Sequence, residues 1–116
     1  MEDTSENSPR VVLTTVADPE QARALARDLV EKRLAACVTI IEGVASIYRW
    51  RGAIEEEREI LLLVKTTAHG LSRLQTSLQQ SHPYEVPEIL AVEASSEAAP
   101  YLRWLAEETK PSEERP

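Results

Sequence analysis

The sequence is poor in cysteine and has no long apolar run. Its single cysteine, Cys37, excludes a disulfide within one chain and suits a reducing compartment. No apolar stretch approaches the length of a membrane span, and residues 1–10 lack the basic and apolar regions of a signal peptide. We therefore expect a cytoplasmic protein with no membrane partner.

Motifs of the common enzyme classes are missing as well. The only glycines are Gly43, Gly52 and Gly70, and the chain contains no Walker loop, G-x-G-x-x-G, H-E-x-x-H or C-x-x-C. No spacing proposes a nucleophile with an activating base. The sequence therefore predicts a protein that is not an enzyme.

The formal net charge of −7 comes mostly from the two ends of the chain. Residues 1–9 and 107–116 hold seven acids and two bases, which gives −5 and leaves −2 for the remainder. No cluster of Lys and Arg resembles a phosphate-binding stripe, so we expect no nucleic-acid partner. The polar, charged ends predict disordered tails at 1–9 and 109–116 around a single domain over 10–108.

What the chain does contain is a long hairpin-like stretch, Ala35–Thr67, rich in β-branched and aliphatic residues. Arg51-Gly52 falls between its two arms, and Gly at the second central position suits the positive φ of a tight turn. The first arm, Ala35–Trp50, would extend about 53 Å, whereas a compact domain of this size is about 35 Å across. We therefore expect the hairpin to bend at Gly43, to reach another subunit, or both.

Both faces of the returning arm are apolar. The run Ile60–Val64 does not alternate with polar residues, which is typical of a strand buried on both sides. The rest of the chain offers two good helices and one short one, and a helix layer can cover only one face of a small sheet. We therefore infer a homo-oligomer in which copies cover each other's second face.

Capping residues and periodicity predict the remaining elements. Asp18-Pro19 begins a helix, since Asp can cap and Pro is tolerated at the first helical position. The apolar stripe that follows at helical spacing consists of Ala22, Leu25, Ala26, Leu29, Val30 and Leu34. Thr67 can cap a second helix, which stops near His82 because Pro83 disfavours helix in the residue before it. The other predicted elements are strands at Arg10–Val16 and Glu88–Glu93 and a short helix over Ala98–Glu108.

The resulting order, β-α-β-β-α-β with a C-terminal helix, is that of the α+β, ferredoxin-like (split βαβ) fold. Two right-handed crossovers would put both main helices on one face of the sheet. The other face is then left for a neighbouring subunit.

The loop after the second helix, His82–Glu88, holds one imidazole, two carboxylates and a phenol, and two prolines stiffen it. One interpretation is a rigid connector whose His and Glu cap nearby backbone. The other is a polar binding site, for example for Zn or Cu, since His and Glu ligate both metals. His82 with nearby carboxylates is too small a ligand set for one chain, so a neighbouring subunit would have to complete a metal site.

Few residues outside this loop suggest a site. Tyr48, Trp50 and Trp104 are either interface packing or the wall of a pocket between subunits. Lys65, at the end of an apolar strand, is either an edge lysine or a pocket cation, and the run Glu55–Glu57 is most simply a solvated face. The candidate ligand-binding cleft consists of Tyr48, Trp50, Lys65, Tyr84, Glu85, Glu88 and Trp104, with His82 as the candidate metal ligand.

Three stretches resemble the CutA family, the divalent-cation tolerance proteins: Lys32–Thr66, His82–Leu90 and Tyr101–Leu105. They carry A-A-C, S-I-Y-R-W-x-G and H-P-Y-E-V-P-E in this order. The resemblance implies a ferredoxin-like subunit in a homotrimer, tolerance to divalent cations, copper in particular, and no established enzymatic reaction. Because that family shares its fold and trimeric form with nitrogen-regulatory signalling proteins, a small-molecule sensor or scaffold trimer is the alternative.

The resemblance also implies metal ligation at the His of H-P-Y, here His82, helped by a preceding His and by a Cys in the first strand. Ser81 and Thr14 stand at those two positions in this chain. Two of the three candidate ligands are therefore replaced, and the resemblance does not carry the full ligand set over to this protein.

Overall fold

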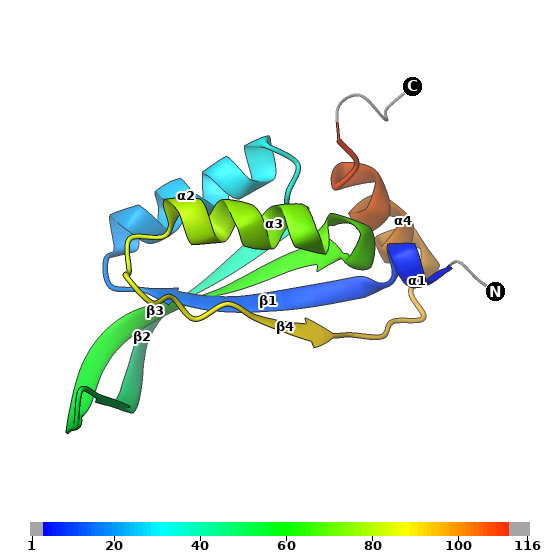
Figure 1. Cartoon of the computed structure of the whole chain (residues 1–116). Coiled ribbons are helices and arrows are strands. Elements are labelled where there is room, and N and C mark those ends of the chain that lie inside the picture. The colour runs from blue at the N-terminus through cyan, green and yellow to red at the C-terminus, as the bar shows by residue number, and fades with distance from the viewer. Residues whose placement is uncertain (1–3, 112–116) are drawn as a thin grey trace.

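The computed structural model describes residues 4–111 and has an α+β fold built on one four-stranded antiparallel sheet (Figure 1). The strand order in the sheet is β2-β3-β1-β4. The elements in chain order are α1 (Thr4–Asn7), β1 (Pro9–Val16), α2 (Pro19–Glu31), β2 (Cys37–Trp50), β3 (Ala53–Thr67), α3 (Ala68–Ser81), β4 (Leu90–Glu93) and α4 (Ala99–Glu108). The α+β class predicted from the sequence is confirmed. No helix among the described residues is long and apolar enough to cross a membrane.

Local capping fixes where the two main helices begin. The Asp18 carboxylate accepts the N–H of the third residue of α2 at 3.1 Å. The Thr67 hydroxyl accepts the N–H of Gly70 at 3.3 Å and caps α3 in the same way. Both starts are as predicted, and α3 ends at Ser81, ahead of Pro83.

The hairpin formed by β2 and β3 turns and bends at its glycines. At the tip, Arg51 and Gly52 have φ angles of 52° and 85°, and a two-residue turn of this kind needs two such left-handed residues. The pairing register shifts between Ile41 and Val44, and Gly43 within this shift has a φ of 77°. The bulge bends the distal hairpin away from the helices (Figure 1), which confirms the bend expected at Gly43.

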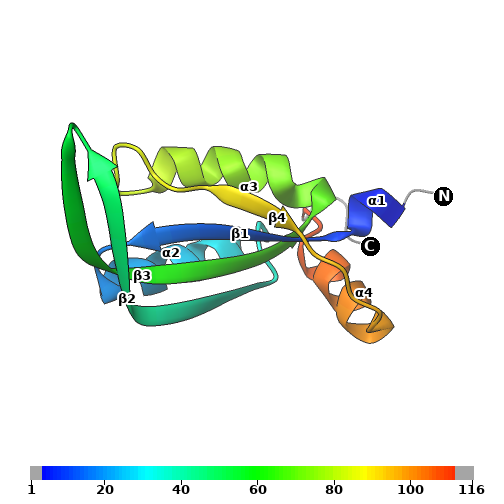
Figure 2. The same ribbon diagram turned by 90° about the horizontal axis from the view of Figure 1, so that it is seen from below.

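Helices α2 and α3 lie side by side on one face of the sheet, and the core fills the space between them and the strands (Figures 1 and 2). Core residues of the strands point toward this layer at every second position, as in Leu62 and Val64 of β3. The core consists of Val12, Val16, Ala22, Leu25, Ala26, Leu29, Leu34, Ala35, Ile60, Leu62, Val64, Leu74 and Leu78. Each fully buried Leu or Val contributes about 1.5–3 kcal/mol relative to an exposed side chain, so this layer stabilises the single chain.

The opposite face of the sheet, which we call the open face, is also apolar. Leu61 and Leu63 alternate with the core residues of β3, and the register places Ile41 beside Leu61 and Leu13 beside Leu63. The apolar side chains of the open face are Val11, Leu13, Ile41, Leu61, Leu63, Leu90 and Val92. Ile41, Leu90 and Val92 are 40%, 58% and 49% exposed. Both faces of the sheet are therefore apolar, as the sequence predicts, and α2 and α3 cover only one of them.

Three details of the elements differ from the sequence-based expectations. Val30, placed on the buried stripe of α2, is 41% exposed, because the stripe that contacts the sheet is narrower than predicted. Leu34 lies beyond the end of α2 and is buried all the same. The fourth strand begins at Leu90 instead of Glu88.

The ends of the chain contain more structure than the predicted tails would. The helical turn α1 lies within the segment 1–9, and Thr109 lies within the segment 109–116. Thr109 is 1% exposed, and its hydroxyl donates to the Leu105 carbonyl at 2.9 Å, which satisfies part of the end of α4. The other residues predicted as tails, 1–3 and 112–116, lie outside the described residues.

Candidate functional site

His82 follows α3 directly and is held by hydrogen bonds at both ring nitrogens. Its Nε2 lies 2.9 Å from the carbonyl oxygen of Thr15, and its Nδ1 accepts the backbone N–H of Tyr84 at 3.0 Å. A carbonyl can only accept, and a backbone N–H can only donate, so the ring is neutral with its proton on Nε2. His82 is 9% exposed, and burial lowers its pKa, although the Thr15 carbonyl and the charge of Glu59 act in the opposite direction.

Tyr84 connects this loop to the hairpin. Its hydroxyl donates to a carboxylate oxygen of Glu59 at 2.6 Å, and its ring centroid lies 4.9 Å from that of His82 at a tilt of 57°. Burial raises the pKa of Tyr84, and the hydrogen bond to Glu59 raises it further because that bond favours the neutral phenol. Glu59 is paired with Val44, the first residue after the bulge, so the bond falls where the hairpin changes direction.

Acidic and phenolic side chains gather around Glu59. The register pairs Tyr48 with Glu55 on the same side of the hairpin as Glu59, which is the continuation of the open face. Loss of solvation raises the pKa of Tyr48, with additional repulsion from Glu57, Glu55 and Glu59. The pKa of Glu88 is also raised, mainly by burial and then by the charge of Glu59. We call Tyr48, Glu59, His82, Tyr84 and Glu88 the bend cluster.

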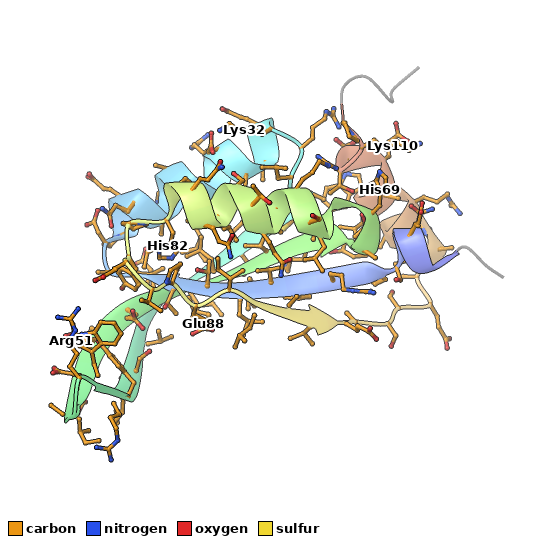
Figure 3. All side chains as sticks on the ribbon, viewed as in Figure 1. Lys32, Arg51, His69, His82, Glu88 and Lys110 are labelled. Carbon is orange, nitrogen blue, oxygen red and sulfur yellow. The ribbon has the colours of Figure 1, made fainter. Side chains whose placement is uncertain are left out.

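The hairpin tip is tied to the same loop. The Arg51 guanidinium lies over the ring of Trp50, 5.2 Å from its centroid, and an Arg51 nitrogen is 3.7 Å from a carboxylate oxygen of Glu85. Both partners of that ion pair are exposed, so it adds little to stability. Figure 3 shows His82 and Glu88 on the segment between α3 and β4, with Arg51 at the tip of the hairpin. The structure thus brings five of the predicted cleft residues, together with His82, to one end of the molecule: Tyr48, Trp50, Tyr84, Glu85 and Glu88.

The other two predicted cleft residues lie elsewhere in the chain. The Lys65 ammonium donates to the Thr39 hydroxyl at 2.6 Å and lies 3.9 Å from the Cys37 sulfur. Lys65 is six residues along β3 from Glu59, a separation of about 20 Å. Trp104 is on α4, at the end of the molecule opposite the hairpin tip (Figures 1 and 2). A single chain therefore does not assemble the whole predicted cleft.

Trp104 lines a groove of its own, with a volume of about 400 Å³. The other lining residues are Val30, Glu31, Arg33, Ala35, Ala36 and Glu108. Arg33, which has a left-handed φ of 62°, donates to the Glu108 carbonyl at 3.2 Å. Arg73 donates to the Thr109 carbonyl at 3.1 Å, so two guanidinium groups hold the C-terminal end of α4 and thereby position Trp104.

The residues of one chain do not fit a divalent metal ion as they stand. Among the residues that the structure describes, no group of three or more His, Cys, Asp or Glu side chains is arranged to hold a metal. Both ring nitrogens of His82 are already hydrogen-bonded, and a metal ion needs a free ring lone pair. Thr14, at the position where the resemblance implies a Cys ligand, is fully buried.

Sequence reasoning overlooked Glu59 and the Thr15 carbonyl. Glu59 directly precedes the apolar run of β3, which marks it as a charge at the edge of the sheet. Nothing in the spacing of the sequence connects it with Tyr84, 25 residues away. The resemblance likewise points to His82 as a ligand without revealing that its nitrogens are already used.

These features define a small α+β protein with one helix layer, an apolar second sheet face and a polar cluster at the bend of a long hairpin. The family model of the CutA1 divalent ion tolerance protein matches residues 10–108. The divalent-cation tolerance protein CutA of Thermus thermophilus is 52% identical over 99 residues, which cover 85% of this chain and 96% of the relative. Human Protein CutA is 39% identical over 103 residues, covering 89% of this chain and 58% of the human protein. The chain belongs to the CutA1 divalent ion tolerance protein family.

Solved structures agree with this assignment. The structure of the Thermus thermophilus protein has a TM-score of 0.84 at 50% identity and covers 88% of this chain and 99% of its own. CutA from Xylella fastidiosa has a TM-score of 0.85 at 41% identity, covering 89% and 99%. A relative from Archaeoglobus fulgidus, described as a periplasmic divalent cation tolerance protein, has a TM-score of 0.83 at 29% identity, covering 88% and 99%.

Proposed function

We propose that this chain acts in divalent-cation tolerance as a non-enzymatic homotrimer whose copies meet over the open face. The observation that carries the proposal is the apolar open face itself. Leu61 and Leu63 at its centre continue into Leu90 and Val92, which are about half exposed in one chain. A contiguous apolar surface of this kind is typical of a protein interface.

The predicted cleft residues lie at two ends of one chain, which supports an assembly of more than one copy. The bend cluster lies at one end of the chain, and Trp104 lies at the other (Figure 1). A pocket that contains both would need contributions from neighbouring subunits.

The β-α-β-β-α-β order and the sheet order β2-β3-β1-β4 support a ferredoxin-like subunit. The single Cys37 supports a cytoplasmic location, as the composition suggests.

Metal binding forms a separate part of this proposal. Imidazole and carboxylate donors suit Zn and Cu, and the bend cluster supplies both kinds. Because one chain lacks a complete ligand set, bound Zn or Cu would take further donors from a second copy or from water.

Sedimentation equilibrium at micromolar protein tests the oligomer. We expect the wild type at three times the chain mass of 13.0 kDa. Leu63→Glu places a charge at the centre of the open face and should give monomer or unfolded protein. Ala24→Glu, on the exposed side of α2, is the matched control and should remain a trimer. A folded wild-type monomer would contradict the proposal.

Growth in added copper or zinc salts tests the tolerance role. A host that lacks its own CutA1-family protein should regain tolerance with the wild type or Ala24→Glu, and should not regain it with Leu63→Glu. Equal growth of all three strains would mean that tolerance does not depend on the open face.

The groove beside Trp104 favours a second candidate function, a sensor or scaffold trimer that responds to a small molecule. A groove of about 400 Å³ with an exposed indole and a guanidinium has the size and the chemistry for a small ligand. Under this alternative, Trp104→Ala loses the cellular response while its trimer mass and metal binding remain those of the wild type.

A further inference from the structure

The open face carries opposite charges at its two ends. Lys65 and Glu59 alternate with the core residues of β3 just as Leu61 and Leu63 do, so all four side chains lie on this face. Six residues of strand, about 20 Å, separate the two charges. Among the residues that the structure describes, neither charge has an ion-pair partner. The open face is therefore apolar in the middle, positive at one end and negative at the other.

The positive end offers Lys65 no carboxylate. Across the sheet, the register places Lys65 in one row with Cys37, Val11 and Val92. Its ammonium donates to the Thr39 hydroxyl at 2.6 Å, and a neutral hydroxyl does not balance the charge. Burying an ammonium without a counter-charge is costly. A neighbour that covers the open face therefore has to supply a carboxylate at this end.

The negative end has carboxylates and lacks a cation. Glu59 accepts the Tyr84 hydroxyl on Oε2, which leaves Oε1 for a second donor. Glu57 and Glu55 follow on the same side of the hairpin. Burial is the main cause that raises the pKa of Glu88, and the negative charge of Glu59 raises it further. A cation beside Glu59 would reduce this repulsion.

We propose that the ammonium of Lys65 in one copy pairs with the carboxylate of Glu59 in the next copy, so that the chains are ordered head to tail around the trimer. The inference rests on the proposed homotrimer and names the contact that orients its copies. Each interface of a ring of three joins two different surface patches, and the two ends of the open face are complementary in charge. The bend at Gly43 turns the acidic end away from the helices (Figure 1), toward the side on which a neighbour would cover the open face.

The first test removes one charge at a time from the full chain. Lys65→Met keeps the length of the side chain, and Glu59→Gln keeps an acceptor for the Tyr84 hydroxyl. Each variant leaves the opposite charge unpaired at every subunit contact, which should weaken that contact about thirtyfold or more. The double variant leaves no charge unpaired and should recover most of this loss. Sedimentation equilibrium at rising urea concentrations measures the dissociation constant of the wild type and the three variants.

The second test separates a contact between copies from an effect within one chain. Lys65→Met carrying a heavy-isotope label is unfolded in urea together with Glu59→Gln, and the mixture is refolded and weighed by native mass spectrometry. In a mixed trimer, one contact joins Met to Gln and another joins an intact Lys65 to an intact Glu59, so a single contact keeps an unpaired charge. We therefore expect mixed trimers in excess of random assortment. Arg27→Gln, which removes a cation from the exposed side of α2, is the matched control and should assort at random with Glu59→Gln.

Two results would overturn the pairing in a wild type that is a trimer. One is a pair of losses that simply add in the double variant, and the other is random assortment of Lys65→Met with Glu59→Gln. If either single variant does not fold alone, recovery of folded trimer in the mixture supports the pairing, and failure to recover it overturns the pairing. A wild-type monomer refutes the proposed trimer before any variant is compared, so the two failures are distinguishable.

Discussion

The Tyr84 hydroxyl donates to the Glu59 carboxylate at 2.6 Å and joins two segments that are 25 residues apart in the sequence. One partner lies in the loop after α3, and the other lies in β3 beside the bulge at which the hairpin bends. The loop and the hairpin therefore fix each other's position. This bond ties the loop after α3 to the sheet face that carries no helix.

Removing the hydrogen bond between Tyr84 and Glu59 should lower the stability of the folded protein. We expect Tyr84→Phe to reduce the free energy of unfolding by about 1–2 kcal/mol, toward the lower end for a bond to a charged acceptor because the pair is partly exposed. Urea unfolding at one fixed protein concentration measures the change, since association also contributes to stability. An unchanged urea midpoint would mean that the bond contributes nothing in solution.

Acid should destabilise the protein through His82. Burial lowers the pKa of His82 in the folded chain, whereas the unfolded chain titrates at about 6.5. The folded state therefore binds fewer protons, and its stability should fall as the pH drops below that value toward the folded pKa. In His82→Gln this loss between neutral and mildly acidic pH should shrink, and His69→Gln controls for the removal of a histidine as such. A stability profile in His82→Gln as steep as that of the wild type would assign the acid sensitivity to other groups.

The bend at Gly43 should resist substitution for conformational reasons. No other atom lies within 4 Å of a Cβ built at this position, so Gly43→Ala meets no steric clash. Its φ of 77° is left-handed, and Ala should lose about 1–2 kcal/mol there. Gly43→Asn should lose less, because Asn adopts this conformation more readily. Thermal unfolding of the two variants side by side gives the comparison, and equal losses would mean that the cost is not one of backbone conformation.

The two arginines that donate to the C-terminal end of α4, Arg33 and Arg73, should slow hydrogen exchange in that helix. Arg33→Ala removes the guanidinium that donates to the Glu108 carbonyl, and amide exchange within α4 should rise by about tenfold. Arg73→Ala should act in the same direction through Thr109. Arg27→Ala, on the exposed surface of α2, is the control. If the rise in amide exchange were confined to residues near position 33, α4 would be held by its apolar contacts instead.

The parts of the fold that the sequence predicts have local causes. Asp18 and Thr67 cap helices within three residues of themselves, and Arg51-Gly52 forms a turn that only those two positions define. The second apolar face is also predictable, because the run Ile60–Val64 occupies both sides of one strand. These features can be inferred without knowledge of the remaining chain.

The bend cluster has no such local cause. His82 bonds to the carbonyl of Thr15, which is 67 residues away. Tyr84 bonds to Glu59, which stands in the sequence between the charged Arg58 and the apolar Ile60, so its sequence neighbours do not reveal this bond. Only the packed sheet brings these groups together. The distance between Lys65 or Trp104 and the loop has the same origin, since it depends on where each residue falls along a long bent strand or at the far end of the domain.

A strand that is aliphatic on both sides carries no polarity signal to decide which side turns inward. Within Leu61–Val64, a slip by one residue would exchange the two faces with little change in the apolar area buried. Glu59 and Lys65 remove this ambiguity, because the same slip would move a carboxylate and an ammonium beneath the helices, where unpaired charge is costly. The two charges that flank the stretch thus act as register marks, and replacing both with leucine should produce a chain with two nearly equivalent ways to fold its central strand.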